Sequence, residues 1–166
     1  KTPLPGQDGK RRLLTIQSLR EWVEMPDMVN VLFVDDETGF LDVITKRMTR
    51  REINATGIPS GEEALALIEK QPVDVVVLDV KMPGCRGGIE ILKEIKTRWP
   101  LIEVIMLTGH AMLDAAREGM EVGAFDYIVK PADFDELFYK IKDACQKKRL
   151  QESKIKGIED IIRKQT

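Results

Sequence analysis

Polar side chains follow four apolar runs of this chain, each at the point where the run ends. They are three carboxylates, one hydroxyl and one ammonium group: Asp35, Asp36, Asp79, Thr108 and Lys130. In an open parallel sheet, ligands bind at the edge formed by the carboxyl ends of the strands. If the first and third strands of such a sheet are neighbours, the three carboxylates lie in one pocket.

The chemistry of such a pocket follows from its charges. Three neighbouring carboxylates repel one another and raise the pKa of at least one of them. A divalent cation removes this repulsion, and a ligand set made only of oxygens favours Mg²⁺ over zinc. Lys130 offers a point charge for a carboxylate or a phosphoryl oxygen, and Thr108 offers a hydroxyl for an oxyanion. A carboxylate nucleophile, a metal, a lysine and a hydroxyl are the parts of a phosphoryl-transfer site.

Each of these residues also has a purely structural interpretation. Asp and Thr are common at strand ends because they suit turns and helix caps. No single one of them therefore indicates a site. The prediction rests on all of them following apolar runs in this order.

The elements that must position these residues alternate regularly along the chain. Continuous apolar runs, such as Val31 to Val34, are typical of strands that are buried on both faces. We expect strands at 31–34, 53–58, 75–78, 101–107 and 125–129. Helical spacing predicts helices near 37–51, after Ser60, near 89–98, near 111–121 and from Asp133. Five such units predict an α/β fold, a doubly wound parallel sheet covered by helices on both sides.

Composition excludes several classes of protein. The 166 residues are 43% apolar and carry a net charge of −2, which excludes binding of nucleic acid or membranes through bulk positive charge. One histidine and two cysteines, Cys85 and Cys145, provide neither a zinc cluster nor a disulfide framework. No apolar run approaches the roughly 20 residues of a membrane span, and no signal peptide is evident. We expect a cytoplasmic protein.

Both ends of the chain extend beyond the predicted sheet. Residues 1–29 form an extension in which a short amphipathic helix is predicted near 11–25. Residues 30–148 form the central domain, and residues 149–166 form a basic helical extension or linker. Its isoleucines keep a coiled-coil rhythm at Ile155, Ile158 and Ile162, and Gly157 interrupts the helix propensity. We favour continuation of the last helix over a separate short helix, and we expect self-association through it.

Four motifs, each at a predicted strand end, resemble the receiver domain of two-component response regulators. They are Val34-Asp35-Asp36-Glu37, Leu78-Asp79-Val80-Lys81-Met82-Pro83-Gly84, Leu107-Thr108-Gly109-His110-Ala111 and Gly123-Ala124-Phe125-Asp126-Tyr127-Ile128-Val129-Lys130-Pro131. The resemblance covers about residues 30–145. The residues of the last two motifs are similar to those in receivers of nitrogen-regulation-type transcription activators. The resemblance implies a flavodoxin-like receiver fold with strand order 2-1-3-4-5.

The resemblance also implies how the site works. Asp79 would accept a phosphoryl group from a phosphohistidine on a sensor histidine kinase. Asp36, Asp79 and the backbone carbonyl of Lys81 would bind Mg²⁺, and Asp35 would support the metal through water. Lys130 would pair with Asp79 and then with the phosphoryl group. The protein would catalyse only its own phosphorylation and dephosphorylation.

The same resemblance implies a switch. Thr108 would turn toward the phosphoryl oxygens, and Tyr127 would change from an outward to an inward position as it does so. The face of the fourth and fifth helices would then act on an output domain or a partner protein. Lys81 and His110 stand at variable positions beside the pocket, where the family tunes its rates. We expect no direct binding of nucleic acid or membranes by this chain.

One loop departs from the family pattern, and several alternatives stay open. The stretch from Met82 to Ile89 is one residue longer than usual, and Arg86 stands where an acidic or small residue is common. A hydrolase with an aspartyl-phosphate typically places another Asp where this chain has Lys81. A nucleotide binder would need a phosphate loop where Asp35 begins an acidic stretch. A degenerate receiver that only docks, a stand-alone receiver and a fragment of a longer regulator remain as further interpretations.

Overall fold

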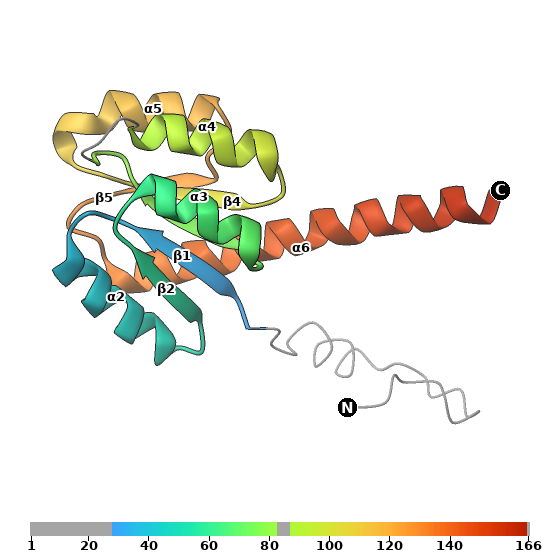
Figure 1. Cartoon of the computed structure of the whole chain (residues 1–166), viewed down its shortest axis with the longest axis horizontal. Helices are drawn as coiled ribbons and strands as arrows, with labels where there is room; N and C mark the ends of the chain where they lie inside the picture. The colour runs from blue at the N-terminus through green and yellow to red at the C-terminus, as the bar shows by residue number, and fades with distance from the viewer. Residues whose placement is uncertain (1–27, 83–86, 166) are drawn as a thin grey trace.

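The computed structural model describes residues 28–82 and 87–165, and within them a five-stranded parallel sheet forms the centre of the fold (Figure 1). The strands lie in the order β2-β1-β3-β4-β5, as the resemblance implied. Their bounds are β1 Asn30–Val34, β2 Asn54–Ile58, β3 Val75–Asp79, β4 Glu103–Thr108 and β5 Asp126–Val129. Every pairing is parallel, so the carboxyl ends of all strands lie at one edge.

Five α-helices and one short 3-10 helix in the described ranges connect and follow these strands. Their bounds are α2 Thr38–Thr49, α3 Gly61–Lys70, α4 Gly88–Arg98, η1 His110–Met112, α5 Leu113–Glu121 and α6 Phe134–Gln165. Helix α3 begins as expected, because the Ser60 hydroxyl accepts a hydrogen bond from the backbone N–H of Glu63. The helix predicted near 111–121 is split, since residues 110–112 form η1 and the α-helix starts only at Leu113.

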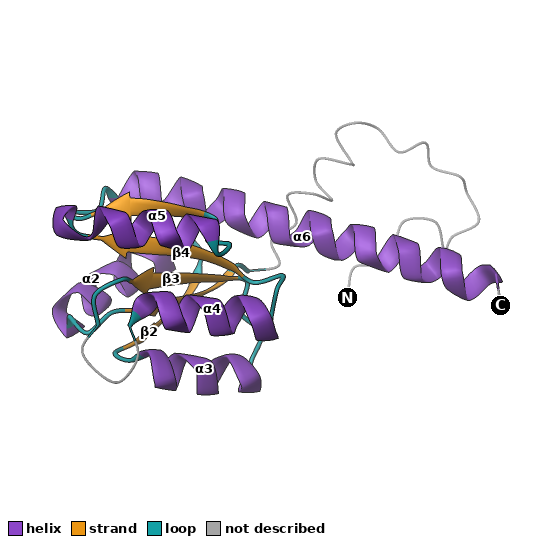
Figure 2. Ribbon diagram, turned by 90° about the horizontal axis from the view of Figure 1, so that it is seen from above, coloured by secondary structure: helices purple, strands orange, loops and turns teal. Residues whose placement is uncertain are grey.

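Helices cover both faces of the sheet (Figure 2). Helices α2 and α6 share one apolar core with residues such as Phe33 and Val77. Helices α3 and α4, joined by the partly buried Ala115 of α5, share the other core with residues such as Leu32 and Val76. Alternate residues of β1 and β3 thus enter opposite cores, which explains their continuous apolar runs. The prediction of a doubly wound sheet is confirmed.

Helix α6 is one continuous helix that leaves the domain (Figure 1). Its last fully buried side chain is Cys145, and residues 152–165 are exposed. Gly157 lies within the helix without ending it. The predicted continuation of the last helix is therefore confirmed. None of the helices in the described ranges is long and apolar enough to cross a membrane.

Two predictions fall outside the described residues. The helix near 11–25 belongs to residues 1–27, and the unusual part of the loop with Cys85 and Arg86 belongs to residues 83–86.

Candidate functional site

The three aspartates predicted to meet do so at the carboxyl edge of the sheet. Asp35 and Asp36 follow β1, and Asp79 ends β3, whose residue Leu78 pairs with Val34 of β1. One carboxylate oxygen from each aspartate lies within 4.8 Å of the others. Asp35 and Asp79 are buried, whereas Asp36 is exposed. The pocket therefore has two buried acids and one acid that faces solvent.

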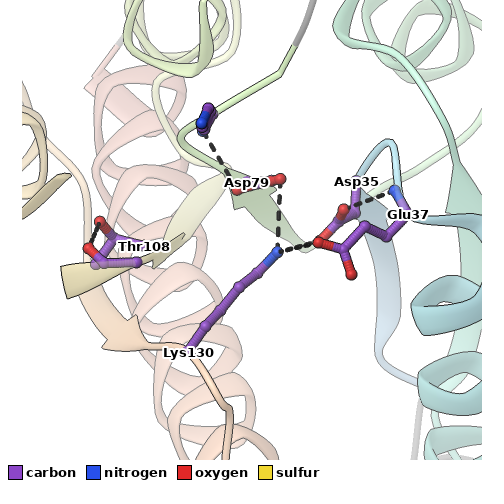
Figure 3. A network of polar contacts seen from close by, with 7 residues as sticks. Asp35, Glu37, Asp79, Thr108 and Lys130 are labelled. Carbon is purple, nitrogen blue, oxygen red and sulfur yellow. Dashed lines mark hydrogen bonds and ion pairs between the residues drawn. The ribbon is translucent and has the colours of Figure 1, made fainter. Parts of the chain in front are cut away.

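Lys130 crosses this pocket from the end of β5 (Figure 3). Its Nζ lies 2.9 Å from Oδ2 of Asp35 and 3.5 Å from Oδ2 of Asp79. It also lies 3.9 Å from Oε1 of Glu37, a residue to which the sequence reasoning gave no role. The main chain of Lys130 is held in place, because the backbone N–H of Lys130 donates a hydrogen bond of 2.7 Å to the carbonyl of Thr108. Lys130 is thus closer to Asp35 than to Asp79.

The electrostatics of the pocket are unbalanced. The pKa of Asp79 is raised to about 6, chiefly by burial and then by the charge of Asp35. Lys130 and the backbone N–H of Lys81, which donates to Oδ1 of Asp79 over 3.2 Å, act in the opposite direction. Burial lowers the pKa of Lys130, but its bond to Asp35 and the nearby carboxylates outweigh this and raise it overall. One ammonium group therefore does not offset the acids around it.

The donor set fits a hard divalent cation. Two buried carboxylates and an exposed one present oxygen atoms to a common point, which suits Mg²⁺. The pKa of Asp79 is raised first by burial and then by the charge of Asp35, and a cation there would act against both. Asp36 is the carboxylate of the three that is most open to solvent.

Thr108 lies beside the pocket at the end of β4, but its hydroxyl is engaged elsewhere. The side chain is fully buried, and Oγ1 lies 3.1 Å from the carbonyl oxygens of both Gly109 and Met112. This hydroxyl therefore contacts the residue before η1 and the last residue of η1. His110 is the first residue of η1.

Two other residues of the predicted site are Tyr127 and Lys81. Tyr127 is 39% exposed on β5. Lys81 is exposed, and it touches the site through its backbone N–H to Asp79.

Gly88 is a site residue that the sequence reasoning did not identify. A Cβ at this position would lie 2.5 Å from the carbonyl oxygen of Asp79 and 2.8 Å from Cα of Val80. Only glycine lets the start of α4 approach the Asp79 backbone this closely. The signal that could have found it is the Gly87-Gly88 pair placed directly before an amphipathic helix.

Comparisons with known proteins agree with this geometry. The family model of the response regulator receiver domain matches residues 31–142. The chain is 34% identical over 128 residues to a putative NtrX-like response regulator of Rickettsia typhi, covering 76% of this chain and 27% of that protein. It is 40% identical over 103 residues to the DNA-binding transcriptional regulator NtrC of Klebsiella pneumoniae, covering 62% and 22%. The chain thus spans about a quarter of the length of these curated relatives.

Solved structures show the same similarity. A response regulator receiver domain protein from Clostridium thermocellum has a TM-score of 0.71 at 35% identity, covering 75% of this chain and 99% of that one. NtrX from Brucella abortus has a TM-score of 0.72 at 28% identity, covering 76% and 29%. Receiver domains are generally signalling switches that bind Mg²⁺ at an acidic pocket. With its sheet order, its acidic edge and the family match over most of its length, this chain belongs to the response regulator receiver domain family.

Proposed function

We propose that this chain is a phosphorylation-activated switch in which Asp79 accepts a phosphoryl group from a sensor histidine kinase. The observation that carries the proposal is the surplus of acids around Asp79, held at the sheet edge beside a single lysine. A carboxylate oxygen of Asp79 would attack the phosphorus of a phosphohistidine. The new O–P bond forms as the P–N bond breaks, and the released imidazole nitrogen takes up a proton.

The residues around Asp79 have distinct roles in this proposal. Asp35, Asp36, Asp79 and the backbone carbonyl of Lys81 would hold Mg²⁺, which would offset negative charge on the transferring group. Lys130 already reaches Asp79, and it would follow the phosphoryl oxygens once they arrive. Lys81 and His110, which flank the pocket along the chain, would tune the rates.

The proposed switch begins with Thr108. Its hydroxyl now donates to the carbonyls of Gly109 and Met112 at the two ends of η1, and a phosphoryl oxygen on Asp79 would compete for that donor. Rotation of the Thr108 side chain toward the phosphoryl group would release η1 and the start of α5. The exposed Tyr127 would then move inward. The face formed by α5, β5 and α6 would carry the change to an output domain or partner, as a shift between two populations.

We also propose that two copies associate through the exposed end of α6. The exposed Ile155, Ile158 and Ile162 occupy coiled-coil core positions. In a parallel pair, Lys154 would face Glu159 of the second copy across this seam, whereas an antiparallel pair would bring like charges together. Light scattering of the wild type should show concentration-dependent association, and Ile158→Asp should abolish it while Lys156→Ala does not. A monomer at all concentrations, with and without phosphodonor, would remove this part of the proposal.

The test of phosphorylation is the intact mass after incubation with a small-molecule phosphodonor and Mg²⁺. The wild type should gain one phosphoryl group, and neither Asp79→Asn nor a chelated sample should gain it. Asp42→Asn, which changes an exposed aspartate on α2, is the matched control and should behave as the wild type does.

A degenerate receiver that only docks is the alternative for this test. Absence of any mass gain in a folded wild-type protein would favour it. The cytoplasmic location stays a prediction, which cell fractionation would check.

A further inference from the structure

A second set of buried charges lies at the opposite edge of the sheet, where α6 leaves the domain. Asp74 directly precedes β3, and its Oδ1 lies 3.0 Å from Nζ of Lys148. Its other oxygen accepts a hydrogen bond of 2.8 Å from the backbone N–H of Asn30, the first residue of β1. Both side chains of the Asp74–Lys148 pair are only 13% exposed. One carboxylate thus joins the start of β1 to the exit of α6.

A second carboxylate at this edge holds the neighbouring lysine of the helix. Glu103 begins β4 and is 1% exposed. Its Oε1 lies 3.4 Å from Nζ of Lys147 and 3.8 Å from Nζ of Lys96 on α4. Val75 and Glu103 are direct partners in the β3–β4 register, so the two carboxylates stand on adjacent strands. We call the contacts of Lys147 and Lys148 with Glu103 and Asp74 the amino-edge clamp.

The amino-edge clamp ties α6 to the domain just beyond the last fully buried side chain of the helix. Apolar anchoring ends at Cys145, and Lys148 follows it by three residues on the same side of the helix. From Glu152 to Gln165 every residue is exposed (Figure 1). The two lysines therefore hold the helix at the turn from which these exposed residues leave the domain.

We propose that the amino-edge clamp is a positioning device that makes the end of α6 a stiff arm of the receiver domain. Two ion pairs to two adjacent strands restrain both the tilt and the rotation of the helix at its exit. The same strands carry Asp79 and Thr108 at their other ends, so the arm is fixed to the two strands that position the site. This inference goes beyond the proposed function and holds whether or not Asp79 is phosphorylated.

Hydrogen exchange of backbone amides in the full chain tests the clamp. Lys147→Met/Lys148→Met keeps long side chains on the helix but removes both charges. Amide exchange at residues 146–152 should become about tenfold faster, because this turn opens without its ties to the sheet. The matched control, Lys156→Met/Lys164→Met, changes two exposed lysines two or more turns further along and should leave that exchange unaltered.

A variant on the sheet side separates the clamp from the helix propensity of α6. Asp74→Asn/Glu103→Gln leaves the helix sequence intact, and the amide oxygen introduced at position 74 can still accept the bond from Asn30. It should accelerate exchange at 146–152 to a similar extent, while the amides of β1 and β3 stay protected and report that the domain is folded. Unchanged exchange at 146–152 in the sheet-side variant would overturn the proposal, even if the lysine variant exchanged faster. Lys147→Arg/Lys148→Arg should keep the wild-type exchange.

Discussion

The two edges of the sheet both carry buried acids, but they differ in how many basic side chains neutralise those acids. At the amino edge, Asp74 is paired with Lys148, and Glu103 lies between Lys147 and Lys96. At the carboxyl edge, Lys130 alone faces Asp35, Asp79 and Glu37 among the described residues, with Asp36 close by. The acids of one edge are balanced by side chains of the protein, and those of the other are left with a negative surplus.

This difference separates structural acids from those of a site. Paired charges at the amino edge hold elements together and need nothing more. The negative charge of Asp79 at the carboxyl edge is costly in the free protein, because burial and then the charge of Asp35 raise its pKa. That cost disappears when a cation binds, so the surplus is what makes the carboxyl edge responsive to ligands. Burial of an acid alone would not distinguish the two edges.

The largest expected effect is a difference between the free energies of unfolding of the wild type and Asp79→Asn when no metal is bound. Asp79→Asn should raise the free energy of unfolding at pH 7.5 by about 2–3 kcal/mol, because it removes a carboxylate whose pKa is about 6 in place of 3.8. In the wild type, stability should fall as the pH rises from about 4 through 6, since the folded protein binds the proton more tightly than the unfolded chain. Urea unfolding in the presence of a chelator measures this. A lower free energy of unfolding for Asp79→Asn than for the wild type would contradict a surplus of negative charge at the carboxyl edge.

The amino edge should respond in the opposite direction. Glu103→Gln should lower the free energy of unfolding by about 2 kcal/mol, because two lysines lose their buried partner. Lys147 is half exposed, which keeps the effect below that of a fully buried pair. The same urea titration applies, and Glu63→Gln, an exposed acid at the start of α3, is the control. A neutral or stabilising result would mean that the two edges do not differ in the way described.

Binding of Mg²⁺ should depend on the acids of the carboxyl edge, and on Asp79 in particular. Mg²⁺ should stabilise the wild type at pH 7.5 and should have little effect on Asp79→Asn. Below a pH of about 6 the apparent affinity should fall by up to about tenfold per pH unit, because the proton on Asp79 competes with the ion. Calorimetric titration from about pH 5 to about pH 8 would follow this. An affinity that does not change with pH would argue against Asp79 as a ligand.

Much of the carboxyl edge could be predicted from local pattern. The apolar runs of β1, β3 and β4 mark strands buried on both faces, and a parallel sheet brings their polar ends together. Nearly all of the amino edge could not be predicted in this way. The pairs between Asp74 and Lys148 and between Glu103 and Lys147 join residues 74 and 44 positions apart, and nothing in their local sequence indicates a partner.

Other details depend on three-dimensional packing as well. The preference of Lys130 for Asp35, its contact with Glu37 and the bond from Thr108 to the last residue of η1 follow from side-chain geometry. The requirement for glycine at position 88 follows from the close approach of α4 to the backbone of Asp79.

We expect the charge surplus of the carboxyl edge to make Asp79, and no other acid, the phosphoryl acceptor. The most direct test is to treat the phosphorylated wild type with borohydride, which reduces an acyl phosphate to an alcohol, and to locate the altered residue by peptide mass spectrometry. Homoserine should appear at position 79 alone. Reduction at Asp35 or Asp36, or at an acid outside the pocket while Asp79 stays intact, would contradict it.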